Sequence, residues 1–321
     1  MLFVTYFFLL RLELDAKLQI VCVHTKGFLD FIKKISCFLT NINYFSFVFH
    51  LFLLTLQMVK LQTKVEIRKS SIEIRPMDRI LFVGSCFADN IGKRFVDNRF
   101  RALVNPYGVM YNPASIRHTV ERMDKNFDIA VFTLGTNHVY RLKETGEIVD
   151  NCQKRPQSLF SEEELTVDEC KKYLAEAVGM LRERNAEVRV ILTVSPIRYA
   201  KYGFHGSQLS KAALQLAADA LTKQYDGVEY FPAYEIMNDE LRDYRFYEPD
   251  MLHPSSQAVD YIYEQFKTMF FSAEAYKMEE EWHPIQRALN HRPFDAEGEE
   301  YKTFLAKARS EEASFMKRWK L

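Results

Sequence analysis

The sequence predicts an α/β protein in which a central, mostly parallel five-stranded sheet lies between two layers of helices (three-layer αβα). Short apolar runs alternate with amphipathic segments from residue 80 onward, as expected for repeated strand–helix units. Strands that alternate with helices indicate a parallel sheet that is covered on both faces. Hydrophobic residues make up 48% of the 321 residues, so a large core can be buried.

The strands are predicted from these apolar runs. In chain order they are RILFV (79–83), RALV (101–104), DIAVFTLG (128–135), EVRVILTVSP (187–196) and VEYFP (228–232). A further segment, 139–151, predicts a hairpin that turns at Thr145–Gly146, because Gly suits a tight turn between two short strands.

Helices are expected between the strands. Their predicted ranges are 86–97, 113–123, 161–184, 206–225 and 253–271. Pro113 and Pro254 stand at the start of two of them, where proline is well tolerated, and Thr166 is a candidate cap. We therefore expect one catalytic domain over 60–290, with further C-terminal helices that end in a charged helical tail, 291–321.

The first 59 residues form an apolar N-terminal extension. Residues 35–59 contain no Asp, Glu, Lys or Arg, and a bilayer-spanning helix needs about 20 mostly apolar residues. Two interpretations stay open. The stretch is a membrane anchor, which would make the protein membrane-associated, or it lies upstream of a true start at Met58, which would leave a cytoplasmic protein.

Composition excludes some classes of function. Lys+Arg and Asp+Glu both number 43, so the net charge gives no reason to expect a nucleic-acid partner. The five cysteines form no CxxC pair, which argues against a zinc site or a disulfide framework. They are Cys22, Cys37, Cys86, Cys152 and Cys170.

Ser85 is the candidate nucleophile. It follows a predicted strand and opens a helix in FVGSCFADN, at the sheet edge where open α/β sheets place their ligands. The helix start also supplies free N–H groups for a developing oxyanion. The alternative is that Ser85 is only an N-cap.

Asp250 and His253 form the candidate acid–base pair in YEPDMLHPSS. The three-residue spacing lets the carboxylate hold the imidazole, which can then accept a proton from a serine. The alternative is a helix-entry cap beside a surface histidine. His138 and His205 are rival histidines.

Two further segments follow predicted strands and offer oxyanion donors. Gly108 lies in NPYGVMYNP and Asn137 in FTLGTNHVY. The Gly108 N–H and the Asn137 amide could join the Ser85 N–H in an oxyanion hole.

Six segments resemble the GSCFA-domain family, within the SGNH/GDSL-like hydrolases, over about 60–290. They are GSCFADNIG (84–92), NPYGVMYNP (105–113), TLGTNHVYR (133–141), TVSPIR (193–198), HGSQLSK (205–211) and DYRFYEPDMLHPS (243–255). The resemblance implies an SGNH/flavodoxin-like fold. It also implies Ser85 as nucleophile, His253 as base and Asp250 as its orienter, with Asn137 matching the oxyanion asparagine of the SGNH group.

The function expected from this resemblance is a serine esterase that removes acyl groups from a cell-surface polysaccharide or another ester, without a metal or organic cofactor. Two alternatives are an O-acyltransferase of the same fold and a non-catalytic glycan-binding module. His205 and Arg245 are candidate substrate contacts, although Arg245 is first expected to pair with Asp243. Cys86 is expected to point into the packed helix rather than act as the nucleophile.

Overall fold

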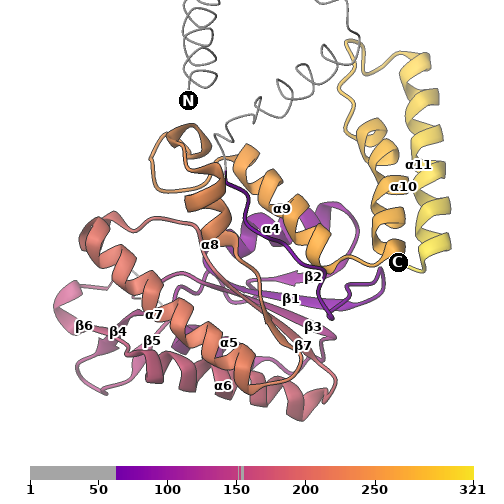
Figure 1. Ribbon diagram of the computed structural model, residues 1–321. Helices are drawn as coiled ribbons and strands as arrows, with labels where there is room; N and C mark the ends of the chain where they lie inside the picture. Colours follow the sequence, from indigo (N-terminus) through magenta and orange to yellow (C-terminus); the bar gives the residue numbers. More distant parts are fainter. Residues whose placement is uncertain (1–62, 151, 153–154) are drawn as a thin grey trace, which may run out of the picture. The chain divides into compact units, whose positions relative to one another are not determined.

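The computed structural model describes residues 63–150, 152 and 155–321. Its central sheet has five parallel strands in the order β2-β1-β3-β7-β8 (Figure 1). The strands are β1 (Arg79–Gly84), β2 (Arg101–Val104), β3 (Ile129–Leu134), β7 (Arg189–Val194) and β8 (Val228–Tyr230). The predicted fold class and all five predicted strands are confirmed.

Helices cover both faces of this sheet (Figure 1). The helices of the described residues are α4 (Cys86–Asp97), α5 (Pro113–Arg122), α6 (Val167–Arg184), α7 (Gly203–Gln224), α8 (Ala233–Glu235), α9 (Ser256–Phe270), α10 (Ala273–Leu289) and α11 (Glu299–Trp319), of which α11 packs on α10. Short 3-10 turns occupy Gln157–Leu159, Ala200–Tyr202 and Tyr244–Phe246, and a π-helical turn occupies Ile236–Leu241.

Side chains that alternate along each strand divide the core in two. In β1, Ile80 and Phe82 belong to the cluster under α4, α9 and α10, whereas Leu81 and Val83 belong to the cluster under α5, α6 and α7. All four are fully buried. Because successive strand residues point to opposite faces, the continuous apolar run serves both layers.

A small antiparallel sheet follows β3. It has the order β5-β4-β6, with β4 at His138–Leu142, β5 at Ile148–Val149 and β6 at Phe160–Glu164. The predicted hairpin is confirmed, and Gly146 turns it at φ +72°. The prediction of a helix from residue 161 is wrong at its start, because residues 160–164 pair with β4.

The entry of α6 explains where that helix begins. The Thr166 side chain accepts from Glu169 N, and the Glu169 side chain accepts from Thr166 N, which is a complete capping box. This reciprocal cap satisfies two otherwise unpaired donors and fixes the helix start after Thr166. The prediction of Thr166 as a cap is therefore confirmed.

The predicted entry of α9 needs a similar correction. The helix begins at Ser256, where the Ser255 side chain accepts from Ala258 N, and not at His253. His253 and Pro254 therefore belong to the preceding loop. After α9, α10 and α11 lie side by side (Figure 1), and Trp282 packs on Phe315 with ring centroids 5.1 Å apart.

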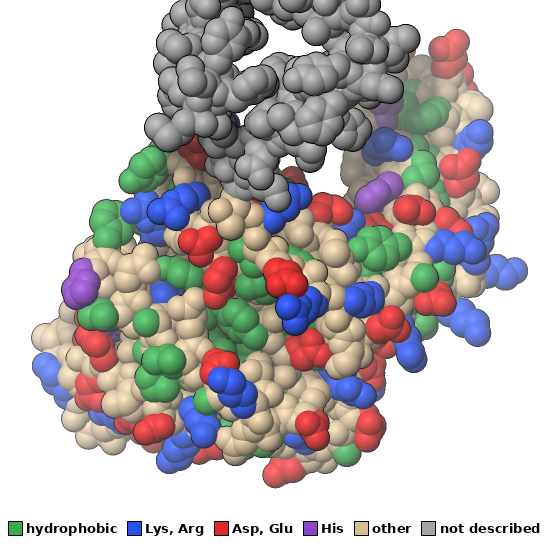
Figure 2. Space-filling model, in the orientation of Figure 1, with side chains coloured by type: hydrophobic (Ala, Val, Ile, Leu, Met, Phe, Trp, Pro, Cys, Tyr) green, Lys and Arg blue, Asp and Glu red, His purple; other side chains and the backbone are tan. Residues whose placement is uncertain are grey.

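Among the described residues, no helix is long and apolar enough to cross a bilayer. The segment predicted as an anchor, 35–59, lies outside the described residues. On the face in Figure 2, acidic and basic side chains are interspersed rather than gathered by sign.

Candidate active site

The carboxyl ends of the parallel strands meet at one edge of the sheet, as expected for a ligand site in an open α/β sheet. Ser85 follows β1, Asn105 follows β2, Gly135 follows β3 and Ser195 follows β7. Backbone bonds continue the pairing past the strand ends: Ser85 N donates to Thr133 O at 3.1 Å, and Ser195 N donates to Leu134 O at 2.8 Å. These residues are thus held in a fixed register.

Ser85 stands between β1 and α4. Its side chain caps α4 by accepting from Phe87 N at 3.2 Å, and its hydroxyl lies 3.1 Å from the Thr133 hydroxyl. The residue has no exposed surface. Ser85 is therefore an N-cap, as the alternative expected. It also stands at the sheet edge where a nucleophile is expected.

Gly84 permits the sharp turn that presents Ser85. Its φ is +150°, and a Cβ there would lie 2.2 Å from Thr133 O, closer than any side chain could be accommodated. Asn105 fixes the same turn from the neighbouring strand. Its Oδ1 accepts from Gly84 N at 2.9 Å, while its Nδ2 donates to Asp89 at 2.7 Å.

The Asp250–His253 turn forms the predicted pair. Nδ1 of His253 lies 2.6 Å from Oδ2 of Asp250, and Oδ1 accepts from the N–H groups of His253 and Leu252 at 3.0 and 2.8 Å. These two backbone bonds, followed by the imidazole bond, lower the pKa of Asp250 to about 2. The carboxylate therefore stays ionised, and Nε2 is left on the opposite side of the ring.

The loop after β7 holds this turn in place. Arg198 N donates to Leu252 O and Arg198 Nη1 donates to Met251 O, both at 3.0 Å. Ile197, next to it, is buried in the core beneath α4 and α9. The strand edge and the Asp–His turn are thus connected by direct bonds.

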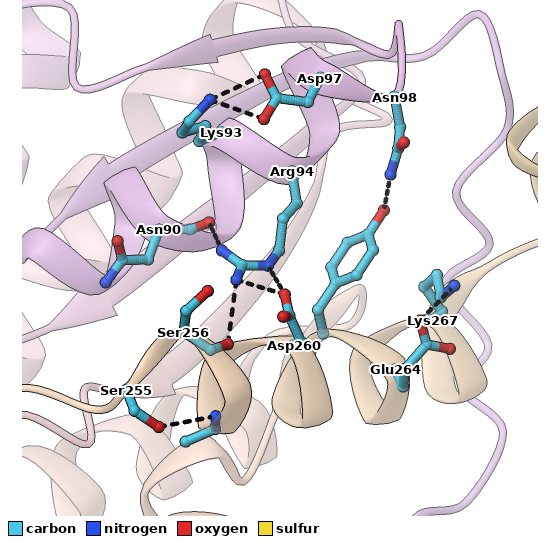
Figure 3. A network of polar contacts seen from close by, with 12 residues as sticks. Asn90, Lys93, Arg94, Asp97, Asn98, Ser255, Ser256, Asp260, Glu264 and Lys267 are labelled. Carbon is cyan, nitrogen blue, oxygen red and sulfur yellow. Dashed lines mark hydrogen bonds and ion pairs between the residues drawn. The ribbon is translucent and has the colours of Figure 1, made fainter. Parts of the chain in front are cut away.

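Helices α4 and α9 lie side by side and run in the same direction (Figure 3). Arg94 in α4 donates to Asp260 Oδ1 at 2.8 Å and to Ser256 O at 3.3 Å, and further along, Asn98 donates to Tyr263 at 3.2 Å. Consequently both helices start at the same end of the molecule. Ser85 caps α4 there, and His253 stands three residues before α9. The direct bond between Ser85 and His253 stays a prediction.

The backbone donors predicted for an oxyanion hole are engaged elsewhere. Ser85 N bonds to Thr133 O, and Gly108 N closes a turn onto Asn105 O at 2.8 Å, with φ of +93° at Gly108. Cys86 is the first residue of α4, so its N–H has no acceptor within the helix. That amide is a better-placed backbone donor than the two predicted ones.

Asn137 forms hydrogen bonds that connect neighbouring parts of the structure. Its Nδ2 donates to Leu165 O at 2.8 Å, and its N–H donates to Ser210 Oγ at 3.0 Å. Among the described residues, its buried Oδ1 has no hydrogen-bond partner. These bonds join β4 to the entry of α6 and to α7, and an oxyanion role for Asn137 stays a prediction.

The secondary candidates lie at the surface. His205 is exposed in the first turn of α7, and Arg245, with its side chain 74% exposed, forms the expected ion pair with Asp243 at 3.6 Å. The rival His138, by contrast, is buried and stacks on Tyr202 with centroids 3.6 Å apart. Within the part of the chain described, no three His, Cys, Asp or Glu side chains gather as a metal-binding group.

Cys86 is half-buried. It packs against the core beneath α4, and its Sγ lies 3.8 Å from the Tyr111 hydroxyl. The thiol thus contacts a tyrosine at the sheet edge as well as the core, and the expectation that Cys86 is not the nucleophile stays a prediction.

Two residues at this edge were not singled out from the sequence. Lys211 is 1% exposed, and its Nζ donates to Gly135 O at 2.6 Å and Ser195 O at 2.8 Å. Burial lowers its pKa to about 7. Tyr199 follows β7 beside Gly135. The sequence does indicate that Lys211 is buried, because Lys211 and Leu214 lie three residues apart on the same buried face of α7.

Comparison with known proteins gives a family. A model of the GSCFA family matches residues 79–127 and 120–266. A second model, described as GSCFA domain protein, C-terminal domain, matches 282–319. No curated protein matches the sequence.

Several solved structures are similar in fold. A carbohydrate esterase family 3 protein from Talaromyces cellulolyticus is 14% identical, with 60% of this chain and 95% of that chain covered and a TM-score of 0.36. A family 3 carbohydrate esterase from Clostridium thermocellum is 12% identical (67% and 100% covered, TM-score 0.37). A GDSL-like lipase from Bacteroides thetaiotaomicron is 16% identical (60% and 86%, TM-score 0.38).

Identities and TM-scores this low identify neither substrate nor mechanism. The family model does not depend on them, since it spans more than half of the 321 residues and covers the segments around Ser85 and His253. The chain belongs to the GSCFA family.

Proposed function

We propose that this protein is a serine esterase in which Ser85 is the nucleophile, His253 the general base and Asp250 the group that orients it. One observation carries the proposal. The α4 and α9 helices start at the same end of the molecule, where Ser85 caps α4 and the loop before α9 carries a preformed Asp–His pair. A carboxylate bound to Nδ1 leaves Nε2 to accept the serine proton.

The reaction would proceed in two steps, acylation of Ser85 and hydrolysis of the acyl-enzyme. Ser85 Oγ attacks the ester carbonyl carbon, its proton passes to His253 Nε2, and the carbonyl electron pair moves onto oxygen. Collapse of this intermediate expels the alcohol, which takes the proton from His253. Water then repeats the sequence on the acyl-enzyme: His253 accepts its proton and returns it to Ser85 as the acid leaves.

The burial of Ser85 bears on how substrate enters. Gly135 faces Ser85, and a Cβ at Gly135 would lie 3.4 Å from Ser85 Cβ. Tyr111, 39% exposed, is on the surface side of this position, and its carbonyl oxygen lies 2.8 Å from the same point. We infer that this packing must open to admit the acyl group, because Tyr199 and Tyr111 already lie in close contact with Gly135.

An aromatic rim beside the Asp–His turn supports a glycan ester as the substrate class. The rim consists of Phe204, Tyr244 and Tyr247, whose ring centroids lie 4.2, 5.8 and 5.4 Å from the Arg198 guanidinium. Phe204 is 55% exposed and Tyr244 is 68% exposed. Exposed aromatic rings that cluster next to a site are unusual on a protein surface and offer flat apolar faces to a sugar ring.

The nucleophile is tested with Ser85→Ala in a p-nitrophenyl acetate assay. Ser115→Ala is the matched control, because Ser115 is equally buried and its Oγ has no partner among the described residues. We expect kcat to fall by about 10³-fold or more in the first variant, since nucleophile and base act as a unit, and to stay unchanged in the second. Full turnover by folded Ser85→Ala would discard the proposal.

The substrate class is tested on the rim. Phe204→Ala should raise KM for an acetylated oligosaccharide but leave KM for p-nitrophenyl acetate unchanged, because only the former reaches the rim. Leu216→Ala removes an equally exposed apolar side chain elsewhere on α7 (58% exposed) and serves as the control. Equal effects of Phe204→Ala on both esters would argue against the glycan.

A further inference from the structure

The Tyr199 hydroxyl is buried and, among the described residues, has no hydrogen-bond partner. Burial raises the pKa of this phenol, so at neutral pH it is an intact O–H donor rather than a phenolate. A buried hydroxyl without a partner is rare in native proteins, and each instance calls for an explanation.

The Tyr199 hydroxyl and the Ser85 side chain both lie against Gly135. A Cβ built on Gly135 would lie 2.6 Å from Tyr199 Oη and 3.4 Å from Ser85 Cβ. Tyr199 Oη and Ser85 Cβ are therefore no further apart than the sum of these two distances, about 6 Å. An oxyanion on a carbon bonded to Ser85 Oγ lies about 3 Å from Cβ, and an O–H···O bond spans about 2.7 Å. Because about 6 Å is the upper limit of the separation, one oxyanion can lie within reach of both side chains.

The Tyr199 ring is held from several sides. Its backbone N–H donates to Ser207 Oγ at 3.2 Å, and its ring meets Tyr111 edge-on with centroids 6.3 Å apart. Lys211 Nζ lies 5.0 Å from the ring centroid. A donor that is fixed before the reaction needs no reorganisation when charge develops, which is the condition for effective oxyanion stabilisation.

We propose that the Tyr199 hydroxyl is a catalytic oxyanion donor, which hydrogen-bonds the carbonyl oxygen of the acyl group attacked by Ser85. This assignment rests on the proposed esterase function. It supplies a side-chain donor where the Ser85 N–H, the Gly108 N–H and the Asn137 amide are engaged with other acceptors. It would act beside the Cys86 N–H at the start of α4.

The test is Tyr199→Phe in the full chain, assayed on p-nitrophenyl acetate and on the thionoester in which the carbonyl oxygen is sulfur. Removing one oxyanion donor typically lowers kcat by about 10²–10³-fold. We expect such a loss on the oxoester with little change in KM. On the thionoester the loss should be much smaller, because sulfur is a weak hydrogen-bond acceptor. Since the hydroxyl has no partner to lose, Tm should stay unchanged.

Tyr234→Phe is the matched control. The Tyr234 ring lies 6.0 Å from Lys211 Nζ, and its hydroxyl already has a partner in Gln208. We expect its oxoester-to-thionoester rate ratio to equal that of the unmodified protein.

The outcomes separate the two proposals. Unmodified rates for Tyr199→Phe, or an equal loss on both esters, would overturn the oxyanion role while Ser85→Ala remains inactive. Full activity of Ser85→Ala would instead remove the esterase proposal itself.

Discussion

The free energy of unfolding of this protein should rise from about pH 7 to pH 10.5 because of Lys211, and replacing Lys211 by methionine should abolish this rise. Lys211 is fully buried, and its ammonium donates to the carbonyls of Gly135 and Ser195 at the ends of β3 and β7. Only burial contributes to the shift of its pKa, from 10.5 to about 7. Methionine has a similar length and flexibility but carries no charge.

The sign follows from proton binding. Between about pH 7 and pH 10.5 the unfolded chain keeps a proton on Lys211 that the folded chain has released, so the free energy of unfolding rises with pH. At about 1.4 kcal/mol per pH unit this interval amounts to about 5 kcal/mol. That figure is an upper bound, because the two carbonyl acceptors favour the charged form and oppose desolvation.

The assay is urea unfolding of the full chain at several pH values from 7 to 10. Lys211→Met should be destabilised near pH 10, since two carbonyls lose a donor at about 1–3 kcal/mol each. Its stability should lack the rise of the unmodified protein, so the deficit should shrink as the pH falls toward 7. Lys267→Met is the control. Its ion pairs with Glu264 and Glu279 raise its pKa, so its loss should give a constant offset over this range. Parallel curves for the unmodified protein and Lys211→Met would refute the reasoning.

Three other substitutions probe the site. Asp250→Asn should lower kcat by about 10²–10⁴-fold. In the unmodified protein the pKa of Asp250 is about 2, so its support of His253 is lost only as pH falls from 3.8 through 2. A kcat profile with an acid limb set by Asp250 above pH 5 would contradict this. Asn137→Ala should cost about 1–2 kcal/mol of stability with kcat of the folded enzyme unchanged, whereas a 10²-fold loss of kcat would restore the oxyanion prediction. Gly135→Ala should reduce both activity and stability, the latter by about 1–3 kcal/mol, because its methyl would collide with the Tyr199 hydroxyl and the Tyr111 carbonyl. Unchanged turnover and Tm would show that this close packing is not needed.

The sequence carries enough information for the main sheet because its signals are local. The three central strands β1, β3 and β7 are largely apolar and buried, and burial on both faces requires such runs whatever the neighbouring strands are. The β6 strand shows the limit. SEEEL (161–165) has helical composition, and only its pairing with β4 makes it a strand, so tertiary context overrides propensity there.

The candidate site likewise has one part that is local in the sequence and one part that depends on tertiary pairing. The Asp250–His253 pair closes within one turn, and its three-residue spacing is visible in the sequence. The oxyanion donors are only in part local. The Gly108 N–H closes a local turn onto Asn105 O, whereas the Ser85 N–H is engaged by Thr133 O, which only sheet pairing brings near. Backbone donors near a nucleophile therefore could not be assigned from the sequence order alone.

Lys211 links stability to the proposed chemistry. Its two bonds fix the carbonyl of Gly135 and the carbonyl of Ser195, which precede the segments that carry Thr136 and Tyr199. A neutral amine could keep these two bonds, because it still has two N–H groups for two acceptors. Loss of the proton near pH 7 should therefore leave the Tyr199 donor in place, whereas loss of the side chain should displace it. On this reasoning Lys211→Met slows ester turnover at every pH, and the unmodified protein keeps its oxyanion geometry on both sides of that titration.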